Sequence, residues 1–283
     1  MRFAIIGGDR RQIETSLFLN SKNHSVVTYG LPKIKGINET ANDFNILADC
    51  DAMILPLPIT KDNTTINSPL IDKDIYISDI LQLKPKFIFG GMISDNLCDV
   101  FESKKIDYYD YYKSEKLTVK NAVLTAEAAV SIAIQNCDRS IYNSKSLVIG
   151  YGRIGKQLAK YLNTLGSEVT ATSRNEETLV NIEIDGITPL KTDEILDFVS
   201  NFDFIFNTVP APILNSDFFA NCKPTVFVED LATNSGVSLN EAKKFGINAD
   251  IYGGLPGKYS PITAAEFITN EILNKCKSVK FKS

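Results

Sequence analysis

The segment Gly150–Gly155, which reads GYGRIG, limits what this 283-residue chain can fold into more than any other feature. It follows the apolar run Leu147–Ile149 and precedes the helix-forming stretch Lys156–Leu165, which is the order of a dinucleotide-binding βαβ unit. In that unit the first glycine permits a tight turn, the second lets the backbone approach a pyrophosphate, and the third lets the helix pack on the strand. The helix N-terminus adds N–H groups and a partial positive charge. We therefore predict a cofactor site, the alternative being a glycine-rich turn without a ligand. Its predicted residues are Gly150, Gly152, Arg153, Ile154 and Gly155.

The end of the next predicted strand, Glu168–Thr172, indicates which nicotinamide cofactor is bound. Proteins that bind an unphosphorylated ribose place Asp or Glu about 20 residues after the glycines. Here Ser173 and Arg174 stand at that position, and the first acid is Glu176. A hydroxyl and a guanidinium suit a 2′-phosphate, because Arg donates paired hydrogen bonds to phosphate oxygens. The sequence favours NADP(H), and an ordinary solvated Arg174 is the alternative.

Two further loops come at the ends of later strands, at the edge where open α/β sheets bind ligands. One is Asn207-Thr208-Val209-Pro210, where dehydrogenases commonly place the nicotinamide ribose, and the other is Glu229-Asp230-Leu231-Ala232. We predict cofactor contacts for Asn207, Thr208, Val209 and Pro210. Ordinary turn chemistry is an equal alternative for each of these residues.

Two series of alternating strands and helices predict an α/β fold with two doubly wound parallel-sheet domains. The first is a flavodoxin-like domain and the second a Rossmann NADP-binding domain. A helix near Asn121–Gln135, with Thr125 as its candidate cap, joins them, and a last helix over Thr263–Cys276 is expected to fold back on the first domain. The predicted domains are residues 1–120 plus 262–283, and residues 121–261. The predicted strands are Phe3–Ile6, Val26–Tyr29, Ala52–Leu55, Lys86–Phe89, Asp107–Asp110, Ser146–Ile149, Glu168–Thr172, Phe204–Thr208, Thr225–Glu229 and Ala249–Tyr252, and the other predicted helices of the first half are Arg11–Leu19, Thr40–Ala48 and Asp95–Lys104.

The composition argues against several classes of function. Lys plus Arg number 30 and Asp plus Glu number 34, and this net charge of −4 speaks against a nucleic-acid partner. The five cysteines are scattered without a CxxC pair, which indicates free thiols and predicts no metal site. The start, Met1–Gly8, reads as a first strand, and no apolar run approaches the roughly 20 residues that cross a bilayer. We expect a cytoplasmic protein that does not bind a membrane.

The first strand leads into Gly7-Gly8-Asp9-Arg10-Arg11, a strand–turn–helix segment without the third glycine. A second dinucleotide is therefore not predicted there. Arg10 and Arg11 stand at a helix start, where cations oppose the helix dipole. Such a placement is easier to understand if the two bind a carboxylate, although a solvated Arg pair is the alternative. Leu55–Pro58 and Gly90–Ser94 end two further strands at the same edge.

Four segments together resemble the dipicolinate synthase A-subunit family over nearly the whole chain. They are Gly7–Arg11, Asn121–Glu127, Gly150–Gly155 and Gly254–Ala264, of which the last, GLPGKYSPITA, is the most specific. The architecture is also similar to that of 2-hydroxyacid and alanine dehydrogenases. The chain departs from the family at Glu229, because relatives usually carry an aliphatic residue before the segment that here reads Asp230-Leu231-Ala232-Thr233.

The resemblance implies NADP-dependent oxidation of a dihydro- or hydroxytetrahydro-dipicolinate to pyridine-2,6-dicarboxylate, in the mother cell of a spore-forming bacterium. The implied partner is a flavoprotein-like dipicolinate synthase B subunit, and a homodimer is left open. Because a dicarboxylate substrate calls for cations and N–H or O–H donors, we expect it between the two domains, with the Arg10-Arg11 turn on one side and Lys258–Thr263 on the other. Glu127 or Asp230 is the candidate base that takes the ring proton. The candidate substrate-binding residues are Arg10, Arg11, Ser94, Lys258, Ser260 and Thr263.

Two other functions compete with this one. A 2-hydroxyacid or alanine dehydrogenase-like oxidoreductase is the nearest, but 2-hydroxyacid dehydrogenases move a proton with a histidine whose pKa lies near the working pH. The one histidine of this chain, His24, comes just before the second predicted strand, where a surface turn is expected. The other alternative is a non-catalytic NADPH-binding subunit that supports a partner.

Overall fold

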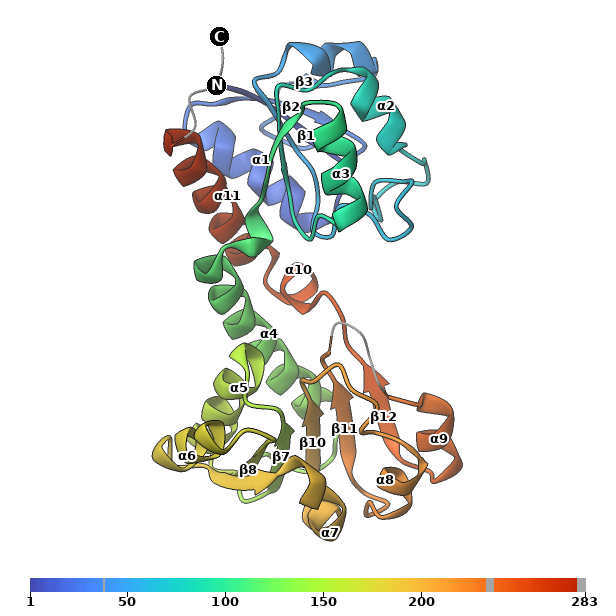
Figure 1. Cartoon of the computed structure of the whole chain (residues 1–283), viewed down its shortest axis with the longest axis vertical. Coiled ribbons are helices and arrows are strands. Elements are labelled where there is room, and N and C mark those ends of the chain that lie inside the picture. The colour runs from blue at the N-terminus through green and yellow to red at the C-terminus, as the bar shows by residue number, and fades with distance from the viewer. Residues whose placement is uncertain (38, 233–236, 279–283) are drawn as a thin grey trace. The chain divides into compact units, whose positions relative to one another are not determined.

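The computed structural model describes residues 1–37, 39–232 and 237–278. The chain divides into two compact units (Figure 1). Met1–Lys120 and the chain from Ser260 onward form the N-terminal unit, and Asn121–Tyr259 form the central unit. Each contains a six-stranded sheet whose paired strands are parallel. With helices packed on both faces of each sheet, the predicted α/β fold of two doubly wound sheets is confirmed.

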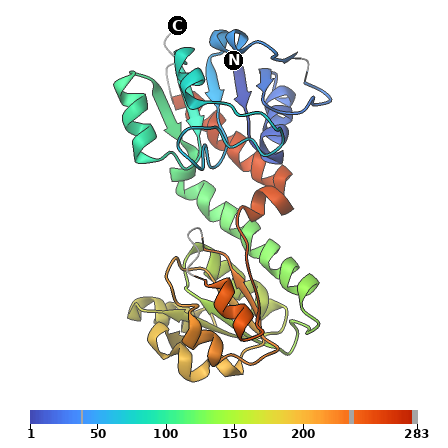
Figure 2. The ribbon, with the colours of Figure 1, turned by 90° about the vertical axis from the view of Figure 1, so that its right-hand side faces the viewer.

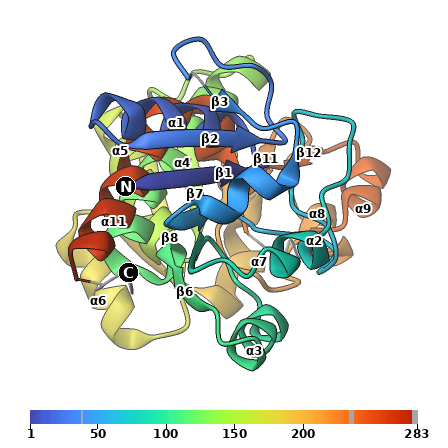
Figure 3. The ribbon, with the colours of Figure 1, turned by 90° about the horizontal axis from the view of Figure 1, so that it is seen from above.

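The sheet of the N-terminal unit has the strand order β3-β2-β1-β4-β5-β6. Without the two-residue edge strand β3, this is the order of flavodoxin-like sheets. Strands β1 and β2 lie side by side near its middle (Figure 3). The strands are β1 Arg2–Ile6, β2 Ser25–Tyr29, β3 Glu39–Thr40, β4 Ala52–Ile54, β5 Phe87–Gly90 and β6 Asp107–Asp110.

The helix predicted over Thr40–Ala48 is wrong. Thr40 ends β3, and a short 3₁₀ helix, η1, covers Phe44–Asp49. Asp43 precedes this helix, and its carboxylate accepts a hydrogen bond from Asn45 N at 2.9 Å. Asp and Asn side chains that bond the nearby backbone favour turns over continuous helix. The hydrophobic spacing of the segment did not reveal this competition.

Two layers of helices cover this sheet. Helix α11 packs along α1 on one face, as Figures 1 and 2 both show. On β1, Phe3 and Ile5 point to that face and share a core with Ile268 and Ile272 of α11, so the last helix belongs to the core of the N-terminal unit. The alternate residues of β1 pack in the second cluster of buried side chains, which includes residues of α2 and α3. The helices are α1 Arg10–Ser21, α2 Ile77–Gln82, α3 Asp95–Ser103 and α11 Pro261–Ser278, with a short 3₁₀ helix, η2, at Tyr111–Lys113.

The central unit has the strand order β12-β11-β10-β7-β8-β9. Numbered within the unit, this is the 3-2-1-4-5-6 order of dinucleotide-binding sheets. The strands are β7 Lys145–Ile149, β8 Glu168–Ser173, β9 Thr188–Lys191, β10 Phe204–Asn207, β11 Phe227–Asp230 and β12 Asn248–Ile251. The helices are α4 Glu115–Asn136, α5 Arg153–Thr164, α6 Glu176–Ile184, α7 Ile195–Phe198, α8 Ser216–Ala220, α9 Leu239–Lys244 and α10 Leu255–Tyr259, with 3₁₀ turns η3 Thr192–Glu194 and η4 Val199–Asn201.

Helix α4 begins at Glu115, eleven residues before the first helical residue that a cap at Thr125 would give. Ser114 precedes it and accepts a hydrogen bond from Leu117 N at 3.4 Å. Thr125 lies inside the helix, where its hydroxyl donates to Asn121 O at 3.0 Å, so its role as a cap is wrong. A threonine that bonds the carbonyl one turn earlier fits a helix interior without ending it.

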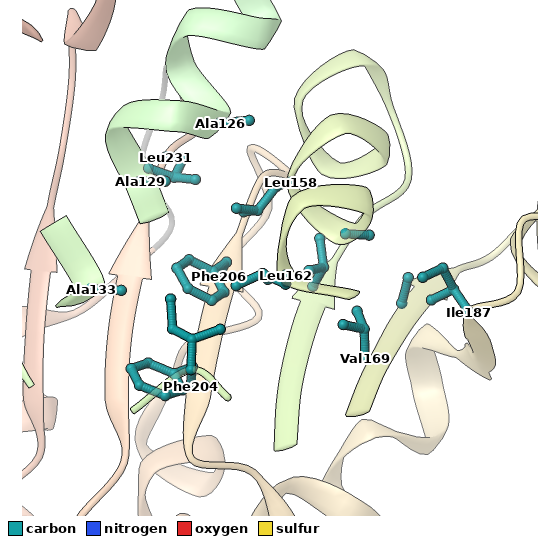
Figure 4. Packing of buried hydrophobic residues seen from close by; sticks show 14 of the residues in the cluster. Ala126, Ala129, Ala133, Leu158, Leu162, Val169, Ile187, Phe204, Phe206 and Leu231 are labelled. Carbon is teal, nitrogen blue, oxygen red and sulfur yellow. The ribbon is translucent and has the colours of Figure 1, made fainter. Parts of the chain in front are cut away.

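Small side chains let α4 pack closely on the central sheet. Ala126, Ala129 and Ala133 contribute to a buried cluster that includes Phe206 of β10 and Leu158 of α5 (Figure 4). By length and apolar composition α4 would also be long enough to cross a bilayer, and half of its most apolar window is buried in the protein. The packing of its alanines is that of a core helix.

Candidate functional site

Hydrogen bonds from two neighbouring strands fix the glycine-rich turn after β7. Gly150 has φ +91°, a conformation that favours glycine, and its N–H donates to the buried Thr172 Oγ1 at 3.2 Å. On the other side, the N–H and the hydroxyl of Thr208 both donate to Ile149 O at 2.9 Å. The turn is therefore held at the carboxyl edge of the sheet by the ends of β8 and β10.

The three glycines of the motif differ in what surrounds them. A Cβ on Gly155 would collide with the backbone oxygen of Gly150, and one on Gly150 would lie 2.5 Å from Val209 Cγ1. A Cβ on Gly152 would meet no atom of the described residues within 4 Å. The fold itself thus requires glycine at positions 150 and 155, whereas the described residues leave space for a ligand beside Gly152.

Helix α5 begins directly after Gly152, with no side-chain cap and no acid in its first turn. Arg153 and Ile154 are its first two residues. A helix start of this kind favours an anion, and the open side of Gly152 lets one approach the backbone. These residues fit the pyrophosphate of a dinucleotide.

Tyr151, inside the glycine motif, is anchored in a way that the sequence did not reveal. Its hydroxyl donates to Asp185 Oδ2 at 2.9 Å, and Lys156 Nζ reaches the same oxygen at 2.8 Å. Burial and this carboxylate raise the pKa of Tyr151, while Lys156 and Tyr151 hold the pKa of Asp185 below its usual value. Asp185 lies 34 residues further on, and no motif connects it to the turn.

At the end of β8, the two residues predicted to select NADP(H) have different surroundings. Ser173 Oγ accepts a hydrogen bond from Asn175 N at 3.0 Å and so belongs to the turn before α6. Arg174 is exposed and makes no hydrogen bond or ion pair with the residues that the structure describes. The first acid after the strand, Glu176, is paired with Lys191 Nζ at 2.9 Å, which raises the pKa of Lys191. The acid nearest the end of β8 is therefore paired, while the next acid, Glu177, is exposed in the first turn of α6.

Lys191 is a candidate that sequence reasoning missed because it missed β9. Pro189 lies inside β9, Thr188–Lys191, and weakens the strand pattern. Proline is tolerated in edge strands, and β9 is an edge strand of this sheet. Leu190 is the one aliphatic residue of β9, which is too little for an alternating pattern.

The loop after β10 is tied to the end of β11. Asn207 is fully buried, and its amide nitrogen donates to Val209 O at 3.0 Å and to Asp230 Oδ1 at 3.1 Å. Asp230 Oδ1 also accepts from Ala232 N at 2.9 Å. Asn207 and Asp230 thus hold the predicted nicotinamide loop, while Thr208 fixes the glycine turn and Pro210 is exposed. Thr233 lies outside the described residues.

Glu229, the departure from the family pattern, lies in the core. Its side chain is 0% exposed, and neither carboxyl oxygen has a hydrogen-bond partner among the described residues. Phe227 of β11 and Leu231, directly after the strand, lie two positions away on either side and pack in the cluster under α4. Burial raises the pKa of Glu229 to about 9, so this carboxyl is protonated at neutral pH.

In the N-terminal unit, Arg10 and Arg11 differ in burial and in their partners. Arg11 is 5% exposed; its guanidinium pairs with Asp9, Nη2 to Oδ2 at 2.8 Å and Nε to Oδ1 at 3.0 Å, and it also donates to Leu57 O. Asp9 caps α1, so its negative charge offsets the arginines at the helix start. Arg10 is exposed and has no partner among the described residues. Of the two arginines, Arg10 is the one that presents a free cation.

The turn that carries these arginines is filled by the protein. The N–H groups of Gly7 and Gly8 donate to Tyr29 O and Asn67 O, both at 2.9 Å. A Cβ on Gly7 would collide with Ser68, and one on Gly8 with Gln12. Side chains of the protein thus fill the space beside Gly7 and Gly8, whereas the space beside Gly152 is open.

Ser94 and its loop are also held by internal hydrogen bonds. Ser94 caps α3, and its hydroxyl donates to Asn63 Oδ1 at 3.1 Å. The buried Asp110 accepts from Met92 N at 3.1 Å and Ile93 N at 3.0 Å. Met92 is exposed in the left-handed region, at φ +56°. The loop is rigidly placed, but Ser94 is already bonded.

The remaining predicted residues lie as follows. Lys258 is exposed in α10 and has no partner among the described residues, and Ser260 and Thr263 are half-buried at the start of α11. Glu127 is exposed on α4 and accepts from Tyr161 OH at 3.4 Å. Tyr161 stands eight residues after Arg153, about 12 Å along α5, so Glu127 is not brought to the glycine turn.

His24 lies before β2, at the amino edge of its sheet. It packs edge-on against Phe3 at 5.3 Å between ring centroids, and burial lowers its pKa. Ligands of doubly wound sheets bind at the opposite, carboxyl edge. The position of His24 therefore does not fit the proton-transfer role of a 2-hydroxyacid dehydrogenase histidine.

Comparison with known proteins agrees with this architecture. Residues 2–112 match the family model of the N-terminal domain of the dipicolinate synthase A subunit. Residues 132–233 match that of the D-isomer specific 2-hydroxyacid dehydrogenase NAD binding domain. The central unit therefore carries a nicotinamide-binding domain of the dehydrogenase type.

Similarity to whole proteins extends along the chain. The dipicolinate synthase A subunit of Bacillus subtilis (strain 168) is 28% identical over 97% of this chain and 95% of its own. A crystal structure of dipicolinate synthase, A chain, from the same species is 27% identical, covers 98% of this chain and 96% of its own, and has a TM-score of 0.85. The fold is shared with the dipicolinate synthase A subunit from Bacillus halodurans, 24% identical over 99% of this chain and 98% of its own, with a TM-score of 0.88. In its N-terminal domain and over its full length, this chain is thus similar to dipicolinate synthase A subunits.

Proposed function

We propose that this chain oxidises a dihydro- or hydroxytetrahydro-dipicolinate to pyridine-2,6-dicarboxylate, with NADP as the hydride acceptor. The observation that carries the proposal is the open side of Gly152, in a glycine turn otherwise filled by its own protein. This is what a bound pyrophosphate needs. The family resemblance supplies the substrate class.

The preference for NADP(H) is supported by the end of β8. Arg174 is free to donate to a 2′-phosphate, and the nearest acid, Glu176, is neutralised by Lys191. Ser173 adds a hydroxyl whose hydrogen is not used by the turn. The acid nearest the strand end, which would favour NAD(H) if it were unpaired, is thus occupied.

The chain's own residues would bind and orient the substrate. Arg10 and Lys258 are the exposed cations that suit its carboxylates, with Ser260 and Thr263 as neutral donors. Arg11 supports Arg10 indirectly, because it holds Asp9 at the start of α1. Ser94 is a weaker choice, since its hydroxyl is bonded to Asn63.

When bound, the nicotinamide supplies an acceptor for the hydride that leaves the ring. The ring also loses a proton to a base, and a hydroxytetrahydro-dipicolinate must in addition lose its hydroxyl group as water. Of the two predicted acids, Asp230 is the better placed, because it lies at the carboxyl edge beside Asn207. Formation of an aromatic ring favours the oxidised product, so one residue that accepts the proton is enough.

By the same resemblance we propose that the partner is a flavoprotein-like B subunit and that the place of action is the cytoplasm of the mother cell during sporulation. The test is turnover by purified chain with and without the B subunit, followed by the ultraviolet absorbance of pyridine-2,6-dicarboxylate. Arg10→Ala and Lys258→Ala should raise KM strongly and leave NADPH binding nearly unchanged. If both variants make the product normally with the B subunit, this substrate site is wrong. If the chain binds NADPH but adds nothing to turnover, it is a non-catalytic support for its partner.

A further inference from the structure

The end of β9 lies beside the end of β8, where the adenosine ribose of a dinucleotide is expected. Ser173 on β8 pairs in register with Lys191 on β9. Both strands are parallel, so both residues stand at the carboxyl edge of the sheet. Lys191 therefore adjoins the Ser173–Arg174 turn from the neighbouring strand.

We propose that Lys191 is a second determinant of cofactor choice. It binds the 2′-phosphate together with Arg174, and it neutralises Glu176, which would otherwise bind an unphosphorylated ribose. The inference rests on the proposed NADP(H) function, because it needs the adenosine ribose at the end of β8. It adds Lys191 and Glu176 to the residues that discriminate between the two cofactors.

The ion pair itself gives the electrostatic argument. Lys191 Nζ lies 2.9 Å from Glu176 Oε1, with side chains 49% and 76% exposed. Ion pairs this exposed contribute little to folding, so stability does not explain the placement. Removal of Lys191 would leave Glu176 as a free carboxylate in the first turn of α6, close to the exposed Arg174 and in addition to the exposed Glu177. A carboxylate there repels a phosphate and accepts a hydrogen bond from a ribose hydroxyl.

A matched ion pair at the other end of β8 provides the control. Lys145 Nζ lies 3.8 Å from Glu168 Oε2, with side chains 55% and 73% exposed. Both residues begin their strands, so they stand at the amino edge, away from the glycine turn. Lys145→Ala removes the same charge from the same sheet without touching the site.

The experiment is titration of NADPH and NADH, followed by nicotinamide fluorescence, at low and high salt. The proteins are the wild type, Lys191→Ala, Glu176→Gln, the double variant, Arg174→Ala and Lys145→Ala. For Lys191→Ala we expect the NADPH Kd to rise about tenfold, with a weaker salt dependence, while the NADH Kd stays equal or falls. Glu176→Gln should tighten NADPH, and the double variant should recover part of the loss. Lys145→Ala should change neither cofactor by more than about twofold.

The outcomes separate this inference from the proposed function. An unchanged ratio of NADPH to NADH affinity in Lys191→Ala, or an equal change in Lys145→Ala, overturns the role of Lys191. If Arg174→Ala nevertheless loses the preference for NADPH, the proposed function stands without it. If the wild type binds both cofactors equally and neither variant alters the ratio, the preference for NADP(H) and the inference fail together.

Discussion

A glycine turn follows the first strand of each sheet, and the two turns differ in what fills them. In the N-terminal unit, Ser68 and Gln12 occupy the space beside Gly7 and Gly8, and the N–H groups of both glycines are bonded to the protein's own carbonyls. In the central unit, no atom of the described residues lies beside Gly152. The residues before the two helices also differ, because the side chain of Asp9 caps α1 whereas Gly152 leaves the start of α5 without a side-chain cap. The same strand–turn–helix logic thus gives a self-contained turn in one unit and a receptive one in the other.

The largest expected effect tests whether the fold itself demands a glycine. Gly155→Ala places a methyl group against the backbone oxygen of Gly150, and we expect it to destabilise the central unit by about 3 kcal/mol. Gly152→Ala, its matched control, should cost less than about 1 kcal/mol. Urea unfolding of both variants measures the difference. Equal losses would break the distinction between required and open glycines.

A second prediction asks what a buried acid does to the central unit. The pKa of Glu229 in the folded chain is raised to about 9, so folding loses stability as pH rises from the unfolded value of about 4.5 towards 9. Glu229→Leu removes this loss and should stabilise the central unit by about 2–3 kcal/mol at pH 7, and by less at pH 5. Thermal unfolding across this pH range is the measurement. A variant that is no more stable at pH 8 than the wild type would contradict the buried, unpaired state of Glu229.

The two arginines of the N-terminal turn offer a third test, within one unit. Arg11→Ala leaves Asp9 without its partner and should cost about 2 kcal/mol of stability. Arg10→Ala removes an exposed side chain and should change stability by less than about 0.5 kcal/mol. Chemical unfolding compares them directly. Equal stability of the two variants would mean that the Asp9–Arg11 pair does not hold the turn.

The smallest expected effect concerns binding at the open turn. Gly152→Ala fills the space beside the helix start and should weaken NADPH about tenfold, about 1.4 kcal/mol, at nearly unchanged stability. Isothermal titration of NADPH gives the Kd. Retained affinity would show that no ligand uses this space, and the contrast between the two turns would lose its functional meaning.

The parts of the fold that repeat regular patterns could be predicted from the sequence. Apolar runs ending in glycine or polar turns gave the strands of both sheets, apart from β3 and β9, which are short edge strands with weak patterns. The glycine turn and the residues after β8 were found because their spacing is fixed by a local strand–turn–helix unit.

What sequence could not predict depends on partners distant in the chain. The Arg11–Leu57 and Tyr151–Asp185 contacts join residues 46 and 34 positions apart, and no local pattern encodes them. Lys191 was hidden for the same reason, since its neighbour Ser173 lies on another strand. Burial of Glu229 was likewise not foreseen, because a glutamate at a strand end usually reaches water.

The position of α11 has a consequence for how the chain is made. One face of the first sheet, with Phe3 and Ile5, is completed by Ile268 and Ile272, which are synthesised after the whole central unit. The central unit is one continuous segment, Asn121–Tyr259, so all of its core residues are synthesised before α11. Domains generally fold as units while the chain is made. Residues of β1 must therefore wait for those of α11, and during that interval the exposed apolar face is where a chaperone would bind and where chains that lack α11 would aggregate.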